Sequence, residues 1–267
     1  MGWLPGVGLA FAARAVATRL SYRTQLSLGL ASTALSMVVL LFMGRVVACA
    51  GSGFESRYGM SYTTFALVGV VVHGAASVGL GAFRSSVRRE QLQGTLEQLL
   101  ASRGSPVLLV ALSGAVDVLG SCAGGAVLVV LCSRLAGLSI DVSAQLVGAV
   151  SLYVVTVCGF GLASAGVVLV SKEGEPVSWV AGTLSALAGG VYFPADLLPP
   201  WLEPVSRALP TTHVLAVVRA SISHGAGVSR LPMLFLAAAA AAAAASGVLV
   251  LRWGLARARR LGTLGEY

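Results

Sequence analysis

The sequence predicts an all-α integral membrane protein with six transmembrane helices. Hydrophobic residues make up 57% of the 267 residues and charged residues only 10%, whereas ordinary soluble domains are roughly a quarter charged. Several apolar stretches reach the ~20 residues that a helix needs to cross a bilayer, and none alternates like a barrel strand, so helices are the structure that satisfies the backbone in lipid. The predicted spans are residues 26–48, 62–83, 107–131, 142–170, 179–193 and 231–253.

The segment before the first span, residues 8–24, is predicted as an interfacial helix. Phe11, Ala15, Thr18 and Tyr22 follow one stripe of a helix, and the arginines lie largely off it. This pattern suits a helix lying in the membrane interface, and a frayed basic flank is the alternative. The first ten residues have neither a basic region nor a cleavage site, so we expect no removed signal peptide and a retained first span.

The basic residues predict the orientation. With both termini in the cytoplasm of a bacterial inner membrane, twelve of the 18 Lys and Arg residues fall on the inner side, as the positive-inside rule requires. Basic flanks beside an anionic leaflet also explain the net charge of +8, so we expect membrane lipid and no nucleic acid as a partner. The twelve are Arg14, Arg19, Arg23, Arg84, Arg88, Arg89, Arg103, Lys172, Arg252, Arg257, Arg259 and Arg260.

The two predicted cytoplasmic links carry acidic residues. Residues 84–104 have leucines spaced i, i+4, i+7 on one stripe and Glu90 and Glu97 on another, which predicts an amphipathic helix outside the bilayer and a candidate docking surface. Pro106 then opens the next span. The shorter link after the fourth span carries Glu173 and Glu175, and it is either part of the same surface or a plain turn.

The segment 189–219 is the most unusual part of the chain. Its five prolines exclude a continuous helix, yet it is too apolar for a free loop. Irregular backbone at membrane depth persists only when it is buried in protein or lines a water-filled cavity. We therefore predict re-entrant short helices at the outer side of the fifth span, feeding a pathway. The later run of nine alanines, 237–245, permits close helix packing, although codon bias is the reading we favour.

Several kinds of chemistry are absent from the sequence. It has no phosphate-binding G-x-x-x-x-G-K-[ST] loop, no H-E-x-x-H and no G-x-S-x-G. We therefore expect no catalytic residues, no cofactor and no metal site on this chain. The four cysteines lie in or beside spans without a C-x-x-C pair, and we interpret them as small packing residues, with a disulfide or metal site as the alternative.

Two ionisable residues fall inside predicted spans. Asp117 lies about 16 Å into the third span, near mid-bilayer, where a charge is costly unless it faces protein or water. Three roles stay open for it: structural hydrogen bonding, pathway lining and proton coupling. His73 in the second span is its one plausible spanning partner, although a satisfied neutral histidine is the simpler interpretation.

At the two segments singled out above, the chain resembles the permease subunits of type 2 ABC transporters. The cytoplasmic motif is R-E-x-x-x-G-T-L-E-x-L-L followed by a small residue and proline. The late motifs are G-G-x-Y-F-P, L-P-x-W-L and L-P-x-T followed by an arginine. The matching residues are Arg89, Glu90, Gly94, Thr95, Leu96, Glu97, Leu99, Leu100, Ser105 and Pro106, then Gly189, Gly190, Tyr192, Phe193, Pro194, Leu198, Pro199, Trp201, Leu202, Leu209, Pro210, Thr212 and Arg219.

The resemblance implies a single permease domain over residues 1–267. It would pair with a second permease copy or a homologous permease and with two copies of a separate ATPase, which binds ATP and Mg. Within it, 84–104 would be a coupling helix and 189–219 an outer gate, and Asp117 and His73 are not part of the family pattern. The implied ATPase contact is Glu90, Gly94, Thr95, Leu96, Glu97, Leu100, Glu173 and Glu175. The implied outer gate is Tyr192, Phe193, Pro194, Pro199, Trp201, Pro210, Thr212 and Arg219.

The function that follows is export, by ATP-driven alternating access, of a hydrophobic small molecule or lipid-like substrate. Aromatic residues are only 7% of the chain, which disfavours a glycan channel with stacking surfaces. The alternatives are a proton-coupled secondary transporter that uses Asp117, and a membrane assembly factor without transport.

Overall fold

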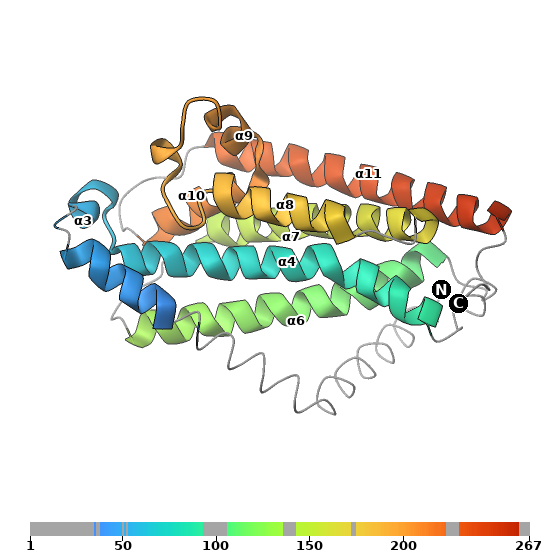
Figure 1. The fold of residues 1–267 in the computed structure, drawn as a ribbon, viewed down its shortest axis with the longest axis horizontal. Coiled ribbons are helices and arrows are strands. Elements are labelled where there is room, and N and C mark those ends of the chain that lie inside the picture. Colours follow the sequence, from blue (N-terminus) through green and yellow to red (C-terminus); the bar gives the residue numbers. More distant parts are fainter. Residues whose placement is uncertain are drawn as a thin grey trace.

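The computed structural model describes residues 35, 38–49, 51, 53–92, 106–135, 143–171, 175–222 and 230–261, and the regular structure within these ranges is helical. Four long helices lie along the long axis of the molecule (Figure 1): α4 (Tyr62–Leu92), α6 (Pro106–Leu135), α7 (Ala144–Ser171) and α11 (Arg230–Leu261). The shorter elements are α3 (Phe54–Tyr58), α8 (Glu175–Ala188), η1 (Ala195–Leu197), α9 (Glu203–Ala208) and α10 (Pro210–Ile222). The interfacial helix predicted at 8–24 lies outside the described residues.

Four helices are long and apolar enough to cross a membrane. They contain the spans Tyr62–Arg88, Val110–Val127, Ala144–Val170 and Arg230–Ala258. These four correspond to the second, third, fourth and sixth predicted spans, so the class of multi-pass helical membrane protein is confirmed. The helix α11 extends past the predicted end at residue 253 to Leu261, because the intervening GLARARRL contains no proline.

The first and fifth predicted spans stay predictions. The described part of the first is the apolar helix Val38–Cys49, which crosses α4 where Gly44 meets Thr63. The fifth corresponds to α8, whose 14 residues end at Ala188, about 21 Å of helix against a hydrocarbon thickness of ~30 Å. The chain leaves helical geometry there because Gly190 adopts a φ of +75°, which favours glycine.

The helix α4 continues past the end of the second predicted span. It runs without interruption to Leu92, because RSSVRREQL contains no glycine or proline. The first part of the coupling helix predicted at 84–104 is therefore the end of α4, and residues 93–105 lie outside the described residues. Pro106 is the first residue of α6, as predicted.

Small residues allow the long helices to pack closely. The most extensive contact between described helices joins α7 and α11. A Cβ added at Gly247 would lie 2.3 Å from the Gly159 carbonyl oxygen, and one added at Gly254 would lie 2.2 Å from that of Gly166. The alanine run contributes to this packing: Ala243 backbone lies against Gly159, and Ala240 and Ala243 are buried. Glycine is therefore required on both sides of this helix pair.

The helices α4, α6 and α7 complete the core. The Phe83 ring of α4 is buried between Gly114 of α6 and Gly161 of α7. Val71 of α4 lies against Gly125 of α6, so α4 and α6 run antiparallel. The short elements α3, η1 and α9 lie together at the end of the bundle where α4 and α11 begin (Figure 1). By the predicted orientation this is the outer end.

Candidate functional site

The proline-rich segment after α8 is ordered into a turn, η1, α9 and α10. Each proline stands where no helical amide bond is lost. Pro194 precedes η1, Pro199 lies in the turn before α9, and Pro210 is the first residue of α10. The prediction that prolines break this segment is confirmed, whereas its re-entrant placement in a membrane stays a prediction.

The turn at residues 189–194 packs directly on α4. Val191 is fully buried, and its carbonyl lies so close to Gly69 that an added Cβ would sit 2.1 Å from the oxygen. Gly190 supplies the left-handed conformation that turns the chain toward α4. The turn and the first part of α4 therefore share one packed surface.

Arg219 joins that surface to α10. Its guanidinium Nη2 donates hydrogen bonds to the Phe65 carbonyl oxygen at 3.0 Å and to the Val191 carbonyl oxygen at 3.3 Å. The guanidinium carbon also lies 3.3 Å from the centre of the Phe65 ring, a cation–π arrangement that strengthens as water is excluded. One arginine therefore holds α10, α4 and the 189–194 turn together.

The link before α4 contacts the later outer link through three side chains. Arg57 Nη2 and the Tyr58 hydroxyl each lie 2.8 Å from the same carboxylate oxygen of Asp196 in η1. Desolvation, the hydrogen bond to Asp196 and the charge of that carboxylate raise the pKa of Tyr58 above its usual 10.0. The phenol therefore stays protonated and donates at neutral pH. We call Arg57, Tyr58 and Asp196 the outer latch.

An aromatic cluster connects the outer latch with Arg219. Phe54 lies 4.5 Å from Tyr58 and 5.5 Å from Phe65, measured between ring centres. The Phe54–Phe65 pair is edge-to-face, a favoured geometry for aromatic rings. The contacts thus run from Asp196 through α3 and α4 to Arg219, which returns to the turn next to η1.

The start of α10 is tied to its neighbours by side-chain hydrogen bonds. The hydroxyls of Tyr153 in α7 and Thr211 lie 3.1 Å apart in a buried position. The Thr212 hydroxyl donates to the Ser206 carbonyl oxygen of α9 at 2.7 Å. His213 Nε2 lies 2.8 Å from the Arg207 carbonyl oxygen. A carbonyl oxygen can only accept, so Nε2 donates this hydrogen bond. Together these bonds fix α9 and α10 as one unit on α7.

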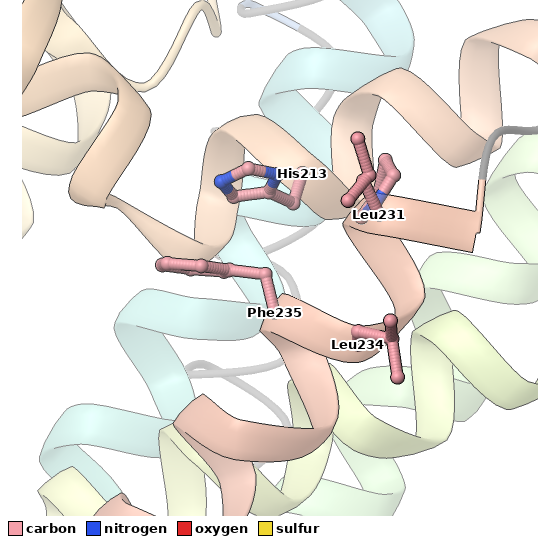
Figure 2. A pocket seen from close by; sticks show the side chains of 5 residues that line it. His213, Leu231, Leu234 and Phe235 are labelled. Atoms are coloured by element: carbon pink, nitrogen blue, oxygen red, sulfur yellow. The ribbon is translucent and has the colours of Figure 1, made fainter.

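A shallow apolar pocket lies between α10 and the start of α11. Figure 2 shows the His213 and Phe235 rings facing each other, with Leu231 and Leu234 beside them, and the ring centres are 4.1 Å apart. Its lining carries no ionisable group other than His213. The pocket contains no arrangement for catalysis, and the described residues contain no cluster of three metal-ligating side chains.

The comparison with known families identifies the chain. A family model described as ABC-2 type transporter matches residues 11–223. The chain belongs to the ABC-2 type transporter family. No curated protein matches it. The protein is therefore a multi-pass permease subunit, a transport component rather than a catalytic one, of a family that associates with an ABC ATPase.

The permease brings only some of its predicted gate residues into contact. Arg219, Pro194, Pro210 and Thr212 belong to the packed assembly described above. The others lie on the surface: Tyr192, Phe193, Pro199 and Trp201 are exposed, Trp201 at 75%. Sequence reasoning missed the partners of Arg219 and the outer latch. The FESRY segment of the first outer link was the available signal, because it places aromatic and charged residues in an otherwise Gly/Ser-rich stretch.

The predicted ATPase-contact residues of the permease are only partly described. Glu90 lies in the last turn of α4 and Glu175 is the first residue of α8, and these two helix ends lie at the end of the bundle opposite α9 (Figure 1). Gly94, Thr95, Leu96, Glu97, Leu100 and Glu173 lie outside the described residues.

Asp117 and His73 do not lie at the same depth in the permease. Phe83 of α4 packs on Gly114 of α6, so the antiparallel register places Asp117 about seven residues, or ~10 Å, from His73 along α4. The His73 ring instead lies 3.4 Å from the Ser77 hydroxyl through Nε2. This register does not favour His73 as the partner of Asp117.

Proposed function

We propose that the permease is the membrane half of an ATP-driven exporter in a bacterial inner membrane, with both termini in the cytoplasm. It works by alternating access as a dimer, with a second copy or a homologous permease, and with two copies of a separate ATPase that binds ATP and Mg. The substrate is a hydrophobic small molecule or a lipid. Low aromatic content supports this class over a glycan, because sugar channels use stacking surfaces.

One observation supports this mechanism above the others: α4 connects the two functional ends. The helix is 31 residues long. Phe65 and Gly69 at its start contact the outer gate, and Glu90 in its last turn begins the ATPase-contact motif. The distance from Phe65 to Glu90 along the helix is about 37 Å. Because no proline or irregular turn interrupts α4, a displacement imposed at Glu90 is carried to the gate contacts.

The test is capture of an ATPase encoded beside the permease gene. Tagged wild type is compared with Glu90→Arg/Glu97→Arg, because a docking helix that loses two acidic groups loses charge complementarity with a basic partner surface. We expect nucleotide-dependent capture by the wild type and its loss in the double variant. The matched control is Glu55→Arg/Glu203→Arg, which reverses two exposed charges on the outer links and should leave capture unchanged.

The same preparation, reconstituted with ATPase, tests export. ATP-dependent movement of a hydrophobic dye or a labelled lipid is expected, and imposing a pH gradient without ATP should not drive it. If the wild type captures no ATPase in any lipid tested, the exporter mechanism is wrong. Transport driven by the pH gradient alone would favour a proton-coupled carrier instead.

A further inference from the structure

The outer latch has the properties of a contact that opens and closes. It joins two links that are 139 residues apart in the chain, and its ion pair is solvent-accessible, with side-chain exposures of 63% for Arg57 and 44% for Asp196. Exposed pairs contribute little to stability because water and salt screen them. The Tyr58 hydroxyl donates a hydrogen bond to the same carboxylate oxygen, and this bond orients the Asp196 side chain toward α3.

We propose that the outer latch, Arg57, Tyr58 and Asp196, holds the gate in its closed form and is released once in every transport cycle. This inference rests on the proposed exporter function and assigns to three residues a role in positioning the gate. Asp196 lies in η1, which is flanked by the 189–194 turn on one side and the turn at Leu198–Leu202 on the other. These turns allow η1 to move away from α3 while Val191 stays bound to Arg219.

The Arg219 contacts and the outer latch differ in exposure, and this difference predicts which of them breaks first. The Arg219 contacts are partly buried and charge-assisted, and they hold the turn to α4. The latch is exposed and is worth about a two- to five-fold change in the ratio of closed to open forms. Movement of α4 therefore breaks the latch first, and η1, including its exposed residue Leu197, swings outward while the 189–194 turn stays bound to α4.

The first experiment measures the latch in the permease alone. Spin labels are placed at Ser56→Cys and Leu197→Cys, two exposed positions beside the latch, after replacement of the four native cysteines. We expect a narrow short distance for this parent and a two- to five-fold larger long-distance population in Asp196→Asn. The charge swap Arg57→Asp/Asp196→Arg should restore the short distance. Unchanged distances in Asp196→Asn would overturn the proposal.

The control is a second exposed ion pair at the same end of the bundle. Glu203 and Arg207 form an ion pair within α9, so this pair does not connect two links. Glu203→Gln removes one negative charge, as Asp196→Asn does, but leaves the contact between the two links intact. The distances should stay as in the parent. If Glu203→Gln lengthens them as much as Asp196→Asn does, the effect is one of surface charge and the latch assignment is wrong.

The second experiment locks the latch during transport. Arg57→Cys/Asp196→Cys is joined by a short bifunctional thiosulfonate, reconstituted with the ATPase and assayed before and after reduction. We expect transport to fall to background when joined and to recover with reductant, while a Glu203→Cys/Arg207→Cys pair joined within α9 has no effect. Undiminished transport by the joined protein overturns the latch. If no unjoined sample shows ATP-driven transport while the spin-label distances are as expected, the proposed exporter function is wrong and the latch contact itself stands.

Discussion

Gly69→Ala tests whether the proposed gate depends on close approach of the 189–194 turn to α4. The new methyl group would lie 2.1 Å from the Val191 carbonyl oxygen and 2.8 Å from its carbon. Backbone cannot rotate away as a flexible side chain can, so the turn must shift outward by roughly 1 Å to reach ordinary contact. That shift also pulls the Val191 carbonyl from Arg219. The substitution therefore loosens two contacts of the gate with one methyl group.

Two other glycines of α4 provide a reference for the expected change in the free energy of unfolding. Alanine is more favourable than glycine within a helix by ~0.5–1 kcal/mol. At Gly74 and Gly81 of α4 nothing lies within 4 Å of an added Cβ, so alanine there should stabilise the permease by up to that amount. At Gly69 overpacking costs ~1–3 kcal/mol, which exceeds the helix gain. We therefore expect a net loss of about 1–2 kcal/mol for Gly69→Ala.

The assay is the midpoint of thermal unfolding in detergent or nanodiscs, followed by tryptophan fluorescence. A change of 1 kcal/mol moves the midpoint by about 2–4 °C for a chain of this size, so Gly69→Ala should fall and Gly74→Ala and Gly81→Ala should hold or rise. Because the midpoint is expected to shift in opposite directions at the two kinds of site, the comparison does not depend on the absolute size of either shift. If Gly69→Ala is as stable as Gly74→Ala, the turn does not pack on α4 and the gate geometry is incorrect.

Two more substitutions follow from the packing. Gly247→Val should prevent α7 and α11 from meeting, because even a Cβ lies 2.3 Å from the Gly159 carbonyl oxygen; we expect a loss of folded protein on size-exclusion chromatography, with Gly182→Ala, which meets nothing within 4 Å, as the tolerated control. Arg219→Lys keeps the charge but loses the planar group stacked on Phe65. Transport should therefore fall in Arg219→Lys, and it should fall several-fold further in Arg219→Leu. Equal activity of the wild type and both variants would exclude Arg219 from the gate.

The sequence predicted the helical membrane class and four spans because long apolar runs have few other solutions. It also identified the 189–219 segment, since prolines act locally on the backbone. The partners of that segment could not be predicted. Asp196 and Arg57 are 139 residues apart, and no local pattern states which outer link meets which. Gly69 in an apolar run has the same appearance as Gly74, although only Gly69 has backbone against it.

The fifth span also shows that local features could be predicted from the sequence whereas long-range contacts could not. Hydropathy continues from Trp179 through Phe193, so the apolar run alone predicted a helix to residue 193. The helix ends at Ala188 because Gly190 turns the chain and Arg219 binds the Val191 carbonyl. The end of this helix thus depends on the backbone conformation of one glycine and on a contact with α10, and a hydropathy profile contains neither.

The tight α7–α11 pair has a consequence for biosynthesis. The helix α7 presents Gly159 and Gly166 to a partner that contains Gly247 and Gly254, and that partner lies beyond the residues matched by the family model. At ~5–20 residues per second of translation, α7 waits on the order of ten seconds in the bilayer before α11 emerges. During that interval its glycine-lined face is open to lipid or to a membrane chaperone, and a ribosome that stops before α11 releases a permease without its closest helix contact.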